Sequence, residues 1–324
     1  MKRRSLLYLS RQEVERVSLP MRSIISALDG MFVQKGRGLV EMPPKPGIHP
    51  RKDSFIHAMP AYIPALESAG IKWVSGYPKN HRRGLPYING LLILNDPETG
   101  IPLSVMDCTW ITAQRTGAAT AVAAKYLARP ESAAVGILAC GVQGRSNLEA
   151  LACVYKVEAV RAYDVNPRTA ERYASEMGDK LGLEVRAVSR PEQAVRGMDI
   201  VVTSGPILKK PAPVIEAGWL SPGAFASPVD FDSYWKPAAL AAFDLIATDD
   251  HAQFAYYRRE GYFKKTPQPY ADLGELAAGL KRGRRSPRQK TAGINLGLAL
   301  EDMATAILIY KRALRRGIGR LLPL

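Results

Sequence analysis

The first candidate for chemistry is a glycine-containing turn that follows a short apolar run. The run 133–138 reads AAVGIL, and the six residues after it read ACGVQG. Gly141 and Gly144 occupy the last two glycine positions of a GxGxxG pattern, and Ala139 occupies the first. Such a turn brings a backbone close to a pyrophosphate at the N-terminus of a helix. Ala139 fits the turn if its φ is negative and is costly if a positive φ is required.

An acidic residue follows at the distance typical of a ribose-binding carboxylate. Asp164 comes 20 residues after Gly144, directly after the expected strand 157–163. A carboxylate there accepts hydrogen bonds from ribose hydroxyls and repels a 2′-phosphate, so we expect NAD rather than NADP. Arg168, four residues further on, would instead favour a 2′-phosphate. Arg145 either reaches the pyrophosphate or lies on the surface of its helix.

A parallel sheet is needed to bring these side chains together. Short apolar runs alternate with helical segments between residues 133 and 248, which is typical of a Rossmann-type, doubly wound α/β domain. We expect strands at 133–138, 157–163, 184–188, 200–203, 224–229 and 245–248, and helices at 147–155, 168–181 and 191–196. Earlier strands are expected at 6–9, 71–76, 87–94 and 101–106, with helices beginning after Ser10 and spanning 112–128. A last helix, 297–314, is expected to pack on the N-terminal half.

Composition limits the class of protein. The chain has 324 residues, of which 47% are hydrophobic and 23% charged, so it is long and apolar enough for about two folded domains. Its three cysteines are far apart in the sequence, which indicates neither a disulfide framework nor a metal site. The apolar stretch that follows the basic residues 2–4 comprises only residues 6–9, which is too short for a secretion signal. We therefore expect a cytoplasmic protein without a membrane segment.

The net charge of +15 is concentrated in two stretches. Residues 281–290 carry six basic side chains and residues 311–320 carry five. Neither stretch interleaves aromatic residues as a base-stacking surface would, so we interpret both as solvated and do not expect a nucleic-acid partner. Nucleic-acid binding through residues 281–290 is kept as an alternative that rests on charge alone.

Several segments together resemble the ornithine cyclodeaminase/mu-crystallin family, and they occur in family order over nearly the whole chain. They are MPAY (59–62), KWVSGYPKN (72–80), GLPYINGLLILND (84–96), TGIPLSVMD (99–107), TAQRTGAATAVAAKYLAR (112–129), the GVQGR turn and LGLALEDMATA (296–306).

The resemblance implies a homodimer of two-domain chains. A substrate-binding and dimerisation domain would comprise 1–130 plus 292–324, with an NAD-binding domain, 131–291, inserted between them. Members of this family act at the Cα–N bond of amino and imino acids by hydride transfer. The cofactor contacts are then expected from the turn, the acidic position and the next strand end: Gly141, Val142, Gln143, Gly144, Arg145, Asp164, Arg168, Thr203 and Ser204.

The resemblance also implies roles for two cations. Lys72 in KWVSG and Arg115 in QRTGAAT match the residues that meet the substrate carboxylate. Two cations can orient an amino acid by charge-assisted hydrogen bonds, with Lys72 also close to the reacting atoms. The alternative is that both side chains belong to ion pairs that stabilise the fold.

The family's catalytic aspartate lies after a late strand of the NAD-binding domain. In GAFASPVDFDSYW (223–235) the register from Gly223 favours Asp232, with Asp230 as the alternative. Either carboxylate could accept a proton from the substrate amine. One of them could instead cap a helix that begins near Ser233.

Two departures from the family pattern concern the substrate. Lys45 stands where the family commonly has an arginine, and lysine lacks the bidentate fork of a guanidinium. His57 stands where ornithine cyclodeaminases have a glutamate that can hold a substrate ammonium. Both changes weaken an assignment to ornithine. The leading hypothesis is an NAD-dependent enzyme that acts at the Cα–N bond of an amino or imino acid, by cyclodeamination or by net oxidation or reduction. The alternative is a non-catalytic ligand-binding protein of the mu-crystallin type.

Overall fold

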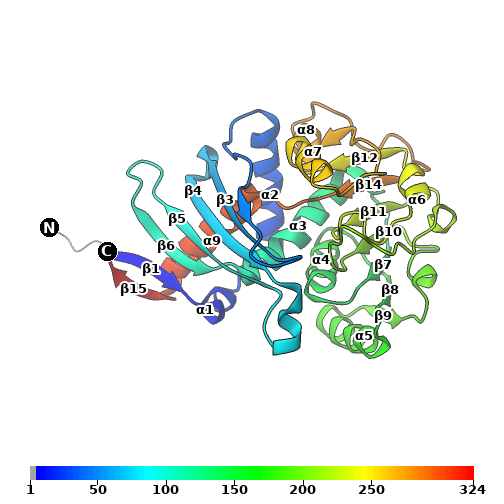
Figure 1. The fold of residues 1–324 in the computed structure, drawn as a ribbon, viewed down its shortest axis with the longest axis horizontal. Coiled ribbons are helices and arrows are strands. Elements are labelled where there is room, and N and C mark those ends of the chain that lie inside the picture. The colour runs from blue at the N-terminus through cyan, green and yellow to red at the C-terminus, as the bar shows by residue number, and fades with distance from the viewer. Residues whose placement is uncertain (1–4) are drawn as a thin grey trace. The chain divides into compact units, whose positions relative to one another are not determined.

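A computed structural model describes residues 5–324. The chain folds into two compact units (Figure 1). The first unit comprises the chain up to Arg115 together with Leu298–Leu324, and the second comprises Thr116–Gly297. The chain thus leaves the first unit inside one helix and returns to it for the last one. The predicted domain boundaries after residues 130 and 291 stay a prediction, and the basic residues 2–4 lie outside the described range.

The first unit contains a mixed sheet with strand order β15-β1-β6-β5-β4-β3-β2. Its strands are β1 (Ser5–Leu9), β2 (Gly47–Ile48), β3 (Phe55–Ile63), β4 (Ser68–Gly76), β5 (Ile88–Asn95), β6 (Pro102–Asp107) and β15 (Arg320–Pro323). Its helices are α1 (Arg11–Arg16), α2 (Met21–Gly36), the first part of α3 (Thr109–Leu127) and α9 (Ala299–Arg316), with 3-10 turns at Pro64–Leu66 and Pro78–Arg83.

Helix α9 packs against β3, β4 and β5 and against α2, so the last helix does return to the N-terminal part of the chain (Figure 1). The predicted capping box of α1 is also confirmed. The Ser10 side chain accepts a hydrogen bond from the Glu13 N–H, and the Glu13 carboxylate accepts one from the Ser10 N–H at 2.8 Å. Both contacts satisfy backbone donors that a helix start leaves open.

The second unit contains the predicted doubly wound sheet. Its strands pair only in parallel in the order β13-β12-β14-β11-β10-β7-β8-β9. They are β7 (Ala134–Leu138), β8 (Ala159–Tyr163), β9 (Glu184–Ala187), β10 (Ile200–Thr203), β11 (Phe225–Pro228), β12 (Leu245–Thr248), β13 (Ala271–Asp272) and β14 (Thr291–Ile294). The helices are α4 (Val142–Val154), α5 (Pro167–Leu181), α6 (Pro237–Ala241), α7 (His251–Arg259) and α8 (Leu273–Ala277), with 3-10 turns at Pro191–Ala194 and Ala217–Trp219.

Two local expectations were wrong. Helix α4 begins at Val142, five residues before the predicted start at Asn147, so most of the GVQGR segment is the first turn of the helix. No helix begins near Ser233, because residues 229–234 form turns and α6 starts only at Pro237. The proposed helix cap by Asp230 or Asp232 is therefore excluded.

No helix in the described part of the chain is both long enough and apolar enough to cross a membrane.

Candidate active site

The junction between β7 and α4 has the geometry that the glycine turn predicted. Gly141 precedes α4 without a side-chain cap, and a Cβ at Gly141 would meet no atom within 4 Å. A Cβ at Gly144 would lie 2.6 Å from the carbonyl oxygen of Ala139, so this helix position requires glycine. Ala139 itself has a φ of +73°, which is the costly alternative for a residue with a Cβ. The junction thus leaves the N–H groups at the start of α4 open to an anion.

Asp164 lies beside this turn, as predicted. Its Oδ2 accepts a hydrogen bond from the Cys140 N–H at 2.9 Å, and its Oδ1 accepts one from the Asn166 N–H at 2.9 Å. The two bonds hold the carboxylate at the end of β8, next to the start of α4. This is the place where a dinucleotide fold presents its ribose-binding acid.

The two arginines that we considered for phosphate binding differ in their surroundings. Arg145 donates from Nη1 to the carbonyl oxygens of Cys140 and Gly141 and from Nε to Glu176, so it ties the turn to α5. Arg168 lies exposed in the first turn of α5. The guanidinium of Arg145 therefore lies beside the turn, whereas the side chain of Arg168 is exposed to solvent.

The remaining predicted cofactor contacts lie at the start of α4 and at the end of β10. Val142 is 66% exposed at the first position of α4, and Gln143 is partly buried beside it. The Ser204 hydroxyl donates to the carbonyl oxygen of Ala139 at 2.8 Å, which links the end of β10 to the turn. Thr203 is fully buried, so its side chain acts inside the unit.

Asp230 is the buried end of a hydrogen-bonded chain. The Trp235 Nε1–H donates to Thr203 Oγ1 at 2.9 Å, and the Thr203 hydroxyl donates to Asp230 Oδ1 at 2.5 Å. Asp230 is fully buried, and desolvation raises the pKa of its carboxyl group to about 7, although the Thr203 bond acts in the opposite direction. The Asp230 side chain therefore lies inside the turn that follows β11, away from solvent.

Asp232 is the more accessible of the two candidates. Its side chain is partly buried, and its Oδ2 accepts a hydrogen bond from Thr266 Oγ1 at 3.4 Å. Partial desolvation raises the pKa of this carboxyl group above its ordinary value. A half-buried carboxyl with a raised pKa is a candidate for general acid–base chemistry.

Phe231, between the two aspartates, has a φ of +64° in the left-handed region. Such a conformation is unfavourable for an aromatic residue and persists only where packing imposes it. The centroid of the Phe231 ring lies 5.1 Å from the ring centroid of Tyr257, 5.5 Å from that of Tyr262 and 4.8 Å from that of Phe263. This aromatic cluster holds the turn in place and so determines where Asp230 and Asp232 point.

Tyr234 at the same sheet edge was not found from the sequence. A Cβ at Gly205 would lie 2.4 Å from the Tyr234 ring, so the ring rests against the backbone that follows β10. Burial first, and then the negative charges of Asp230 and Asp164, raise the pKa of the Tyr234 phenol to about 12. Nothing in the spacing of SYW (233–235) signals that this ring lies near the carboxylates of Asp230 and Asp164.

The first unit brings Lys72 and Arg115 together with two buried acids. Lys72 Nζ on β4 lies 2.5 Å from Asp302 Oδ2, and Arg115 Nε on α3 lies 3.1 Å from Asp302 Oδ1. Arg115 Nη1 lies 2.6 Å from Glu301 Oε2. The acids are fully buried in the first turn of α9, Lys72 is 1% exposed and Arg115 is 7% exposed. We call these four residues the ion-pair cluster.

Lys72 and Arg115 thus form ion pairs inside the first unit, which was the alternative to substrate binding for both cations. Desolvation lowers the pKa of the Lys72 amine and raises that of the Glu301 carboxyl, while each opposite charge in the cluster acts against these shifts. The two acids were missed. Their signal was present in the LGLALEDMATA segment, where an acidic pair opens an otherwise apolar helix.

His57 and Lys45 lie near the edge of the same sheet. His57 on β3 pairs with Gly47 on β2, and its ring stacks on Phe55 at 4.3 Å between centroids. Burial and the positive charges of Lys45, His49 and Lys72 lower the pKa of the His57 imidazole to about 4. The imidazole is therefore neutral at pH 7, in surroundings that disfavour a further cation.

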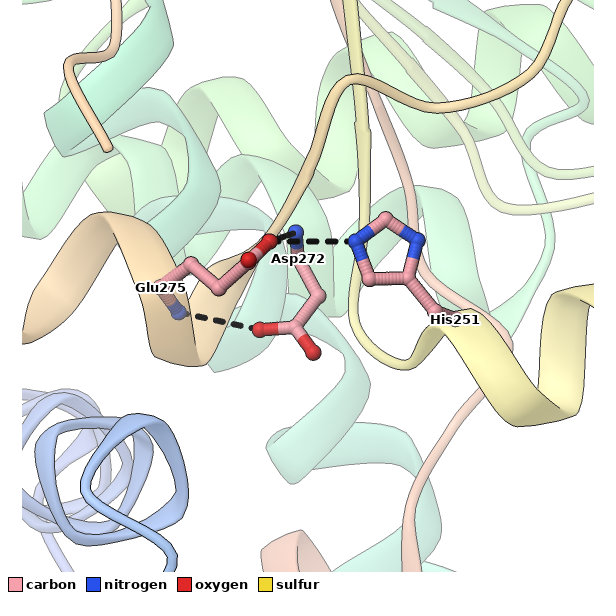
Figure 2. Close-up of side chains that lie close together, drawn as sticks. All are labelled: His251, Asp272 and Glu275. Carbon is pink, nitrogen blue, oxygen red and sulfur yellow. Dashed lines mark hydrogen bonds and ion pairs between the residues drawn. The ribbon is translucent and has the colours of Figure 1, made fainter. Parts of the chain in front are cut away.

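His251, Asp272 and Glu275 present ligand-type atoms within 4.8 Å of one another (Figure 2). Asp272 and Glu275 form the capping box of α8, with Glu275 N–H to Asp272 Oδ1 and Asp272 N–H to Glu275 Oε2 both at 2.9 Å. His251 Nε2 lies 3.0 Å from Glu275 Oε2, and Lys281 Nζ lies 3.0 Å from the other oxygen. Because an ammonium already faces this carboxylate, we assign the group to the stability of α8.

In the basic segment 281–290, Arg284 has a structural role. Arg284 donates from Nε to the carbonyl oxygen of Leu127 at 2.7 Å and from Nη2 to Thr291 Oγ1 at 2.9 Å. A surface hollow of about 410 Å³ is lined by Asp244, Arg285, Ser286, Arg288 and Gln289. These residues precede β12 and β14, so the hollow lies at the sheet edge opposite to the glycine turn.

The fold and the site define a class of protein: a Rossmann-type dinucleotide-binding unit inserted into an α+β unit. The chain belongs to the ornithine cyclodeaminase/mu-crystallin family, whose sequence pattern matches residues 6–317.

Three relatives show the range of this likeness. The nodulation efficiency protein NfeD of Rhizobium meliloti is 34% identical over 96% of this chain and 97% of its own. The Δ1-pyrroline-2-carboxylate reductase of Thermococcus litoralis, solved with NADH and L-proline, has a TM-score of 0.88 and 34% identity over 97% of this chain and 99% of its own. An archaeal alanine dehydrogenase, solved as a dimer with bound NAD, has a TM-score of 0.87 and 33% identity over 99% and 100%.

Proposed function

We propose that this protein is an NAD-dependent oxidoreductase that transfers hydride at the Cα–N bond of a small amino or imino acid. One observation carries the proposal. At the carboxyl edge of the parallel sheet, a glycine turn that opens into α4 occurs together with an accessible carboxyl in the turn after β11. The relatives solved with NADH and L-proline, and with NAD, support the same class of reaction.

The residues at the sheet edge fit the dinucleotide. The space beside Gly141 and the uncapped start of α4 suit a pyrophosphate, and Asp164 suits the ribose hydroxyls. We assign the contacts of the phosphate side to the first turn of α4, with Arg145 holding the shape of the turn. NAD, when bound, accepts or returns the hydride. Asp164 disfavours a 2′-phosphate, so NADP is expected to bind more weakly.

We assign the substrate carboxylate to Lys72 and Arg115. Both side chains are nearly buried, and their charges are balanced by Glu301 and Asp302. The acids fix the orientation of the ammonium and guanidinium before a ligand arrives, which lowers the entropy cost of holding the substrate. Lys45 and His57 are assigned to the substituent on Cα, where a neutral imidazole and a lysine do not favour an ammonium group.

Asp232 is proposed to move the proton. In the oxidative direction the C–H bond at Cα breaks with its electron pair leaving as hydride, and the amine loses a proton to the Asp232 carboxylate as the C=N bond forms. In the reductive direction the protonated Asp232 returns that proton. Asp230, fully buried and held by Thr203, is proposed to keep the Asp232 turn in place.

The test is a panel of amino acids and cyclic imines with NAD(H) and NADP(H), followed at 340 nm with product identification. A net oxidoreductase forms or consumes about one NADH per turnover, whereas a cyclodeaminase shows none because the hydride returns. Asp232→Asn is expected to lower kcat by about 10²–10⁴-fold with NADH affinity unchanged. Turnover unchanged in Asp232→Asn would overturn the assigned role. Ligand binding without turnover of any substrate would favour a non-catalytic protein of the mu-crystallin type.

We also propose that the chain forms a homodimer through the face of the first sheet that α9 does not cover. Trp73 on β4 and Leu91 on β5 are paired in register and are 49% and 46% exposed. Ile71 and Ile93 form the next pair on that face. An apolar face of this kind is typical of an interface, and the archaeal alanine dehydrogenase is described as a dimer. We propose the cytoplasm as the location, because the spacing of the three cysteines in the sequence indicates no disulfide framework.

A further inference from the structure

Asn295 is a buried amide whose polar atoms have no partner among the described residues. It follows β14 directly and is 6% exposed, and both its Nδ2 and its Oδ1 lack a hydrogen bond. A buried amide without partners costs free energy, so such groups in native proteins call for a ligand or another explanation.

The backbone around Asn295 is held firmly, so the side chain cannot easily turn away. Ile294 pairs with Thr248 of β12. The N–H groups of Leu296 and Gly297 both donate to Asp249 Oδ2 at 2.7 Å. Anchors on both sides thus keep the amide at the carboxyl edge of the parallel sheet.

The edge where Asn295 lies is the ligand-binding edge of a doubly wound sheet. Strand β14 lies between β11, which leads to Asp230 and Asp232, and β12. Gln253, in the first turn of the helix that follows β12, is a second buried amide there, and its Oε1 also lacks a partner among the described residues. Polar atoms without partners therefore follow adjacent strands, on the side of the sheet that carries the candidate proton-transfer group.

We propose that Asn295 binds the carboxamide of the nicotinamide ring, an inference that rests on the proposed NAD-dependent function. A primary amide offers one donor group and one acceptor, and a carboxamide offers the complementary pair. The Asn295 N–H donates to the carboxamide oxygen, and the Asn295 oxygen accepts from the carboxamide N–H. This pairing satisfies both buried atoms and fixes which face of the ring meets Cα.

The experiment compares the affinities of the full-length protein for NADH and for ADP-ribose, which lacks the nicotinamide. Asn295→Leu keeps the volume and removes both polar atoms. NADH affinity is expected to fall on the order of 10-fold, from the loss of two hydrogen bonds, with ADP-ribose affinity unchanged. The melting temperature without ligand should stay the same or rise, since an unpaired amide has been removed. Asn295→Ser, a smaller change, is expected to give the same selective loss.

Ser132→Ala is the matched control. Ser132 is also buried with an unpartnered hydroxyl among the described residues, but it precedes β7 at the opposite sheet edge. Both affinities of Ser132→Ala should equal those of the wild type. Equal losses for NADH and ADP-ribose in the Asn295 variants, or no loss for either, would overturn the carboxamide assignment. A wild-type protein that binds ADP-ribose and NADH equally would overturn it too, and one that binds neither would overturn the proposed function itself.

Discussion

Asp230 shows how burial changes the chemistry of a single side chain. Its carboxyl group has an ordinary pKa of 3.8, and complete desolvation raises this to about 7 in the folded protein. The folded state therefore binds the proton more tightly than the unfolded state does. Between about pH 4 and pH 7 the folded chain carries more protons at this site, so the free energy of unfolding decreases as pH rises.

We expect Asp230→Asn to remove this pH dependence. The wild type should lose stability between pH 4 and pH 7, by an amount on the order of 4 kcal/mol at full burial. Asn cannot titrate, so the melting temperature of the variant relative to the wild type should increase over that range. Thermal unfolding from pH 4.5 to pH 8 measures the difference. Asp179→Asn, at an exposed position of α5, is the control and should parallel the wild type. If the melting temperatures of Asp230→Asn and the wild type changed in parallel with pH, the raised pKa of Asp230 would be contradicted.

At the scale of elements, the β7–α4 junction separates two uses of glycine. Gly144 is required by close contact, because its Cβ position lies 2.6 Å from a carbonyl oxygen. Gly141 has a φ of −81° and open space around its Cβ position, so neither strain nor contact requires glycine there. Its value lies in leaving room for the ligand.

Alanine at these two positions should therefore have opposite effects. Gly144→Ala forces α4 away from β7 and is expected to lower the free energy of unfolding by about 1–3 kcal/mol. Gly141→Ala should keep the stability of the wild type or raise it slightly, while NADH affinity falls because the methyl group occupies ligand space. Thermal unfolding together with NADH fluorescence titration checks both. A fully stable Gly144→Ala protein would refute the contact argument.

At the scale of the whole molecule, the face of the first sheet that α9 does not cover is the proposed dimer interface. Leu91 lies at its centre, paired with Trp73. A charge placed there must be desolvated when two copies associate, which is costly without a partner charge. Leu91→Lys should therefore shift the protein from dimer to monomer.

Light scattering after size-exclusion chromatography measures this shift. Leu280→Lys is the matched control, since Leu280 is 64% exposed in the second unit and far from this face in sequence. The control should elute as the wild type does. A Leu91→Lys protein that stays dimeric would place the interface elsewhere.

The sequence by itself determined the doubly wound sheet, the glycine turn and the place of Asp164, because apolar periodicity and glycine spacing are local. It also indicated that Lys72 and Arg115 matter. Only the tertiary structure joined them to Glu301 and Asp302, which are separated from Arg115 by more than 180 residues of chain. The positive φ of Ala139 and Phe231, the burial that separates Asp230 from Asp232, and the unpartnered amide of Asn295 likewise depend on packing between distant segments, which no local pattern encodes.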